Sequence, residues 1–89
     1  MTVRITADAV QISPATVRPG SVTFQVTNNA SVPYDLDIDG PGPDGELENL
    51  QPNEKRALTM TLRAGEYEIE SNTEQGPDRE RHAVLTVQG

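Results

Sequence analysis

The strongest constraint on the fold is an alternation of apolar and polar residues that returns in short segments along the chain. Residues 21–28 place Val22, Phe24 and Val26 on one face and threonine or glutamine on the other. Such period-two alternation is typical of an antiparallel strand with one buried face. Similar segments lie near residues 3–5, 10–12, 34–39, 57–62, 66–70 and 83–87. The sequence therefore predicts an all-β sandwich or small barrel of about seven short strands.

Glycine, proline and asparagine separate these segments, and no linker or internal repeat divides the chain. We therefore expect a single domain over residues 1–89. At most one short helical turn is predicted, beginning at Asp44 as a cap and ending before Pro52. Its apolar side would carry Leu47 and Leu50, which are three residues apart.

Charge and residue usage exclude several classes of partner and site. The chain carries a formal net charge of −7, whereas nucleic acids and anionic membranes are bound through Lys and Arg patches, so we expect neither as a partner. Apolar runs are only a few residues long, and we expect neither a signal peptide nor a membrane-spanning helix. The chain has no cysteine, which removes disulfides, zinc–thiolate sites and thiol nucleophiles.

Five phrases occur in an order and spacing that resemble the cupredoxin family, the small Greek-key copper proteins of the plastocyanin type. They are GSVTFQVTN at 20–28, VPYDLDIDG at 32–40, LQPNE at 50–54, LRAGEY at 62–67 and LTV at 85–87. The resemblance implies a Greek-key β-sandwich over most of the chain. It also suggests an extracytoplasmic location, periplasmic or secreted.

The same resemblance assigns the four copper-ligand positions of the family to residues that do not bind copper. These positions fall on Tyr34, Ser71, Gly76 and Arg81. Blue copper sites need a thiolate, which this chain lacks. The resemblance therefore implies a cupredoxin-like scaffold without its metal, and we expect no cofactor. Because protein interiors are close-packed, we expect the Tyr34 ring and the Arg81 stem to fill the vacated site, with the guanidinium bonded to a carboxylate or carbonyl.

An acidic segment supports an alternative of another class, a calcium-binding β-domain. Asp35, Asp37, Asp39 and Glu46, with Gly40 between them, match the pattern of an EF-hand loop. Asp44, in the same segment, is the fifth candidate ligand. Pro33 precedes the segment and is incompatible with the entering helix of an EF-hand. The competing interpretation is that the aspartates form the solvent face of a strand whose inner face carries Tyr34, Leu36 and Ile38.

Catalysis has little support in the sequence. His82 is the single histidine, and a hydrolytic relay with Asp78 or Glu80 and a serine is the weakest hypothesis. We expect no enzyme activity and no catalytic residue. The polar connection from Asn72 to Arg81 is a candidate edge for contact with another protein, because arginine makes bidentate contacts. The sequence thus favours a non-enzymatic structural or protein-interaction module.

Overall fold

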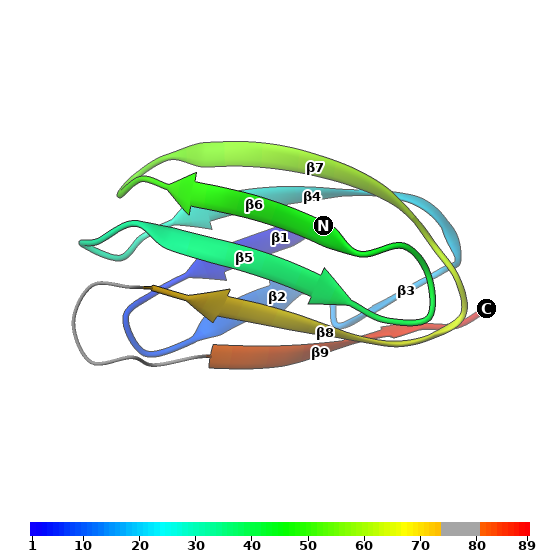
Figure 1. Ribbon diagram of the computed structural model, residues 1–89. Coiled ribbons are helices and arrows are strands. Elements are labelled where there is room, and N and C mark those ends of the chain that lie inside the picture. The colour runs from blue at the N-terminus through cyan, green and yellow to red at the C-terminus, as the bar shows by residue number, and fades with distance from the viewer. Residues whose placement is uncertain (74–80) are drawn as a thin grey trace.

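The computed structural model describes residues 1–73 and 81–89, which form nine strands in two sheets packed face to face (Figure 1). The first sheet has the order β2 (Val10–Ser13), β1 (Thr2–Ile5), β4 (Gly20–Asn28) and β7 (Lys55–Leu62). The second has the order β3 (Thr16–Val17), β9 (Arg81–Val87), β8 (Gly65–Asn72), β5 (Tyr34–Asp39) and β6 (Gly45–Leu50). The predicted all-β sandwich is confirmed. The described residues include no helix that is long and apolar enough to cross a membrane.

Both sheets are mixed. Neighbouring strands run antiparallel, except that β1 lies parallel to β4 and β3 lies parallel to β9. The strand predicted at residues 66–70 extends further than expected, because β8 continues to Asn72 and pairs with β9 as far as Ser71 opposite Arg81. The strand β5 is flanked by β6 on one side and β8 on the other.

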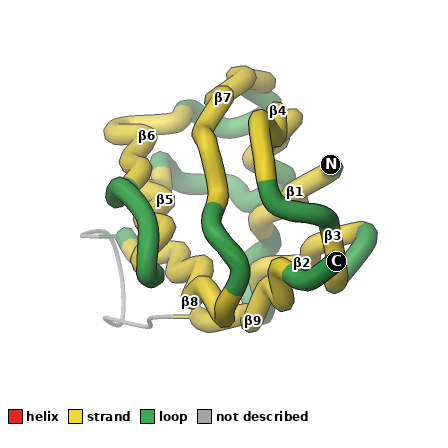
Figure 2. The backbone as a smooth tube through the Cα atoms, turned by 90° about the vertical axis from the view of Figure 1, so that its right-hand side faces the viewer, coloured by secondary structure: helices red, strands yellow, loops and turns green. Residues whose placement is uncertain are grey.

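One hydrophobic core lies between the sheets, and the end-on view in Figure 2 shows the strands surrounding it. Its largest fully buried side chains are Tyr67 and Phe24. The alternation predicted which residues point inward: Tyr34, Leu36 and Ile38 are buried in β5, while the aspartates between them face outward. Period-two patterning therefore located the core correctly.

The predicted helical turn around Leu47 and Leu50 is wrong, because both residues belong to β6. The pairing of β5 with β6 shifts by one residue between Tyr34–Leu50 and Leu36–Leu47, which marks a β-bulge. Asn49 adopts a left-handed backbone conformation there, with φ of 53°. The bulge turns both leucines inward although they are three residues apart, so a helix-like spacing arises within a strand.

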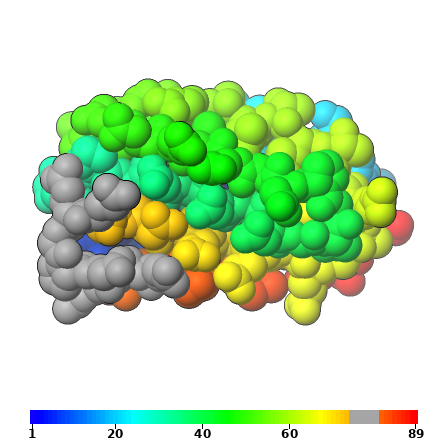
Figure 3. Space-filling model, in the orientation of Figure 1, coloured from blue at the N-terminus to red at the C-terminus, as the bar shows by residue number. Residues whose placement is uncertain are grey.

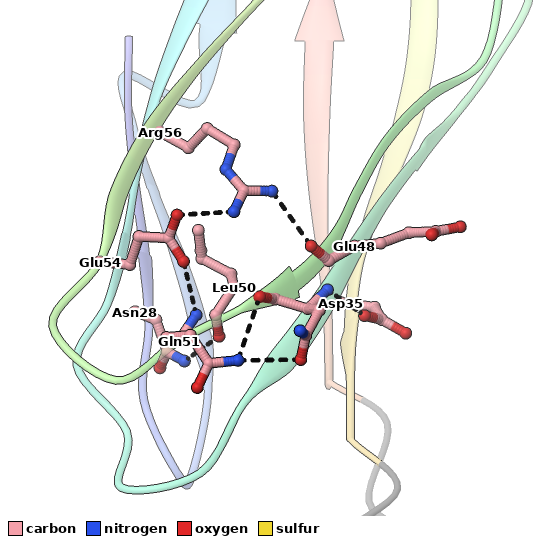
Figure 4. A network of polar contacts seen from close by, with 8 residues as sticks. Asn28, Asp35, Glu48, Leu50, Gln51, Glu54 and Arg56 are labelled. Atoms are coloured by element: carbon pink, nitrogen blue, oxygen red, sulfur yellow. Dashed lines mark hydrogen bonds and ion pairs between the residues drawn. The ribbon is translucent and has the colours of Figure 1, made fainter.

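A fully buried asparagine at the end of β4 joins the two sheets (Figure 4). The Asn28 amide nitrogen donates hydrogen bonds to the carbonyls of Val32 (3.0 Å) and Leu50 (2.8 Å), and its side-chain oxygen accepts one from the Ala30 backbone nitrogen (2.8 Å). Leu50 ends β6, so these bonds connect the first sheet to the edge of the second. The four hydrogen-bonding positions of the Asn28 side chain are thus largely used inside the protein.

The charged side chain of Arg56 forms a second link between the sheets. The Arg56 guanidinium, on β7, donates to the Glu54 carboxylate at 2.6 Å and to the Glu48 carbonyl at 3.0 Å (Figure 4). Glu54 also accepts a bond from the Gln51 backbone nitrogen at 2.8 Å. These contacts lower the pKa of Glu54, the backbone bond from Gln51 contributing most and Arg56 next.

The turn between β7 and β8 is fastened by Tyr67. Its buried hydroxyl accepts a hydrogen bond from the Arg63 backbone nitrogen at 3.0 Å. A tyrosine that bonds back to the backbone a few residues upstream is the tyrosine-corner arrangement of β-sandwiches. The loop between β5 and β6 covers the same ring, with Gly40 against its carbons and Gly42 against its hydroxyl.

Candidate functional site: an acidic sheet face

The outer face of the second sheet carries an unusual concentration of carboxylates. The strands β5, β6 and β8 contain no lysine and no arginine. Their acidic residues all lie on the side away from the core, and they are Asp35, Asp37, Asp39, Glu46, Glu48, Glu66, Glu68 and Glu70. Together with Asp44, in the loop before β6, we call these residues the acidic face.

The net negative charge of the protein arises in these three strands. The chain has 14 acidic and seven basic residues, so the parts outside β5, β6 and β8 hold six acids against seven bases. The net charge of −7 therefore comes entirely from three neighbouring strands. Figure 3 views this side, where atoms of β5, β6 and β8 occupy most of the surface.

Strand register brings like charges directly opposite one another. Asp37 lies between two glutamates, with Glu46 as its partner on β6 and Glu70 as its partner on β8. In the next row, Asp39 is paired with Glu68. Side chains at such positions have Cβ atoms about 4.5–5.5 Å apart, and like charges there are destabilising.

Two carboxyl groups of the acidic face have raised pKa values. Partial desolvation, followed by the charges of Asp44, Asp37 and Glu68, raises the pKa of Asp39. A hydrogen bond with the Glu48 carboxyl, followed by the Glu48 charge, raises the pKa of Glu46. In both groups, neighbouring negative charges add to the leading cause and further raise the pKa.

A pH dependence of stability follows from these shifts. Because Asp39 and Glu46 hold protons more tightly in the folded protein than at their ordinary pKa values of 3.8 and 4.5, they add stability at low pH that is lost as pH rises through their folded pKa values. Glu54 acts oppositely, but its contribution is lost only below its ordinary value of 4.5. We therefore expect the free energy of unfolding in urea, at low salt, to be greater near pH 5 than near pH 7.

Salt supplies the control for this measurement. Added salt screens exposed charges, so the difference between the two pH values should shrink at about 1 M ionic strength. An unfolding free energy that is flat or rises from about pH 5 to about pH 7 at low salt contradicts this assignment of the pKa shifts.

Hydrogen-bond donors contact some of these carboxylates. The Asn72 amide donates to Asp37 Oδ2 at 3.3 Å, and the Asn49 backbone nitrogen donates to Asp35 Oδ1 at 2.7 Å. On the neighbouring strand β9, His82 Nδ1 lies 3.0 Å from Glu68 Oε1, with both side chains about half exposed. The imidazole of His82 thus lies on this side of the sheet.

The five candidate calcium ligands are not gathered around one point. Asp35, Asp37 and Asp39 are spaced along an extended strand, which separates the first from the last by about 13 Å. Glu46 lies opposite Asp37 on β6, and Asp44 shares a hydrogen bond with Asp39. The arrangement consists of separate carboxyl pairs on a sheet, because a strand cannot curl its alternate residues around an ion as an EF-hand loop does.

Three of the four residues that the cupredoxin resemblance assigns to copper-ligand positions are described by the structure. Tyr34 is buried, Ser71 is fully buried, and Arg81 is half-buried as the partner of Ser71 on β9. Ser71 Oγ and Arg81 Nε are both buried, and neither has a hydrogen-bond partner within residues 1–73 and 81–89. The guanidinium bond expected for Arg81 is therefore not found at Nε. Gly76 lies outside the described residues.

Of the residues named for the hydrolytic relay, His82 lies within the described part of the chain. His82 projects from the outer face of the second sheet, whereas Ser71 points into the core, so the sheet itself separates them. Asp78 and Glu80 lie outside the described residues. Elsewhere, a shallow hollow of about 170 Å³ lies over β1 and β2, with Arg4 as the one ionisable group among its lining residues.

Most of the Asn72–Arg81 connection, proposed as a contact edge, also lies outside the described residues. Its first residues are described: Asn72 contacts the acidic face, and the Thr73 hydroxyl donates to the Pro33 carbonyl at 2.7 Å. No protein-family model matches the chain, and no curated protein is detectably similar to it in sequence. Function must therefore be inferred from the acidic face itself.

Proposed function

We propose that this protein is a non-enzymatic, cupredoxin-like interaction module, and that its acidic face binds a lysine- and arginine-rich surface of a partner protein. The observation that carries this proposal is the confinement of the entire net charge to β5, β6 and β8. Solubility alone is served equally well by charges of both signs spread over the surface.

The cost of the arrangement supports a role in recognition. Cross-strand pairs such as Asp37 with Glu46 and Glu70 lower the stability of the free protein. A cationic partner would convert these repulsions into attractions and would accelerate association through long-range steering. Such a surface also rejects nucleic acid and anionic membranes, as the net charge predicts.

Several features support the cupredoxin-like part of the proposal. The phrase at 20–28 coincides with β4, the phrase at 32–40 contains β5, and the phrase at 62–67 forms the tyrosine corner at Arg63 and Tyr67. Ser71 and Arg81, which stand at the expected Cys and Met positions, are partners on adjacent strands. Neither supplies a thiolate or thioether, so the scaffold would work without copper.

A partner on the acidic face would also reach the start of the Asn72–Arg81 connection. Asn72 ends β8 and donates to Asp37, at the centre of the face. We therefore include this end of the sheet in the proposed binding surface.

Titration with a lysine- and arginine-rich peptide at low ionic strength tests the proposal. Asp37→Lys removes the central carboxylate, and it should weaken binding about fivefold, or roughly 1 kcal/mol. Asp8→Lys makes the same change of charge in the exposed turn between β1 and β2, and it should have far less effect. Because Asp37→Lys places a cation between two glutamates, the variant should be at least as stable as the wild type. Equal weakening by both variants would show that only net charge matters.

A further inference from the structure

We propose that Glu68, Glu70 and His82 form a binding site for one divalent transition-metal ion, with Zn²⁺ as the expected occupant. The site lies at the β8–β9 edge of the acidic face, on the opposite side of the sheet from the former copper-ligand positions Ser71 and Arg81. It does not depend on the peptide binding proposed above.

The backbone holds the three side chains in a triangle. Glu68 and Glu70 occupy alternate positions of β8, so both point outward. His82 is the register partner of Glu70 on β9, the strand that runs beside β8 in Figure 1. One ligand atom from each residue lies within 4.8 Å of the other two. The position of each ligand is thus fixed by strand pairing, without any loop.

The distances are close to those that a metal needs. His82 Nδ1 and Glu68 Oε1 are already 3.0 Å apart. A tetrahedral Zn²⁺ bonded to both at about 2.0–2.1 Å would separate them by about 3.4 Å. A movement of a few tenths of an ångström, within reach of two half-exposed side chains, would bring these two atoms to that separation. The Glu70 carboxylate, whose ligand atom lies within 4.8 Å of both, would complete the set by a side-chain rotation toward the ion. Water would complete the coordination of the ion as the fourth ligand.

The set of donor atoms selects the class of ion. One imidazole nitrogen with two carboxylates suits Zn²⁺ and its neighbours in the first transition row. Ca²⁺ prefers six to eight oxygen ligands and gains little from an imidazole. Copper(I) prefers thiolates and thioethers, which this site lacks. The nitrogen ligand therefore distinguishes this site from general attraction of cations to carboxylates.

The surroundings add attraction without adding ligands. Asp37 is the register partner of Glu70, and Asp39 is the register partner of Glu68, so a second row of carboxylates lies beside the triangle. These charges raise the local concentration of a dication. Asp37 and Asp39 would also accept hydrogen bonds from a metal-bound water. In established sites, loss of such an outer hydrogen-bond partner commonly weakens metal binding 10–100-fold.

The test is a Zn²⁺ titration of the intact protein at neutral pH, followed by calorimetry and by the imidazole signals in the proton NMR spectrum. Because His82 is the only histidine, these signals report on the proposed ligand alone. His82→Ala and Glu68→Gln each remove one ligand. Glu66→Gln is the matched control, since it neutralises a glutamate of the same strand and face outside the triangle. Circular dichroism verifies that each variant is folded.

We expect saturable binding of a single Zn²⁺, with a shift of both imidazole signals. His82→Ala and Glu68→Gln should each weaken it by at least about tenfold, and Glu66→Gln by less than about twofold. Three results would overturn the proposal: binding that does not saturate, unchanged affinity in His82→Ala, or Ca²⁺ bound as tightly as Zn²⁺. The last result would instead favour an oxygen-only site among the carboxylates of Asp35–Glu46.

Discussion

Replacing Asn28 with Asp should destabilise the protein by about 3–5 kcal/mol. The side chain is fully buried, and its amide nitrogen donates to the carbonyl oxygens of Val32 and Leu50. The carboxylate would lose both donors and would direct a negative charge at the two carbonyl oxygens. The link between β4 and the edge strand β6 would be lost with them.

Asn29→Asp is the matched control, because Asn29 is the exposed neighbour in the same turn. We expect it to change stability by less than about 0.5 kcal/mol. Urea unfolding of both variants at neutral pH measures the difference. An Asn28→Asp variant within about 1 kcal/mol of the wild type would contradict the role that we assign to this side chain.

The second large effect is expected at the loop that covers Tyr67. A Cβ at Gly40 would lie 2.2 Å from Tyr67 Cδ2, and a Cβ at Gly42 would lie 2.5 Å from the Tyr67 hydroxyl oxygen. Both contacts are far shorter than van der Waals distance. Gly40→Ala and Gly42→Ala should therefore each cost about 1–3 kcal/mol, the usual range for overpacking.

A double-mutant cycle with Tyr67→Phe separates the two contacts. Removing the hydroxyl relieves the contact at Gly42 but leaves the ring carbons opposite Gly40 in place. Gly42→Ala should thus cost clearly less in the Tyr67→Phe background, whereas the cost of Gly40→Ala should be unchanged. Tyr67→Phe alone should cost about 1 kcal/mol, for the hydrogen bond from Arg63. Equal coupling at both glycines would contradict the packing described.

The sequence predicted the strands because burial on one face forces period-two alternation, as in Tyr34, Leu36 and Ile38. It failed at Leu47 and Leu50, since a β-bulge reproduces the three-residue spacing of a helix. The asparagine at position 49 was the available signal of a bulge, because asparagine tolerates the left-handed backbone conformation that Asn49 adopts. Asparagine was expected only to separate strands, whereas the role of Asn28 as a buried link depends on Leu50, which is 22 residues away.

The sequence predicts the acidic side of each strand separately, but it does not predict which strands lie side by side. Each acidic strand alone resembles an ordinary solvated face, and the segment at Asp35–Glu46 even matches a calcium-loop pattern. Pairing of β5 with β8, and of β8 with β9, is what brings Glu68, Glu70 and His82 beside the aspartates. Such pairing is set by the topology of the whole domain, which local periodicity does not encode.

The most direct test of the recognition surface is to map, by amide NMR shifts, where a lysine- and arginine-rich peptide binds the wild-type protein. We expect the affected amides to be concentrated in β5, β6 and β8, and the shifts to diminish as salt is added. Shifts spread evenly over both sheets, or centred on β1 and β2, would contradict the assignment of the acidic face as the binding surface.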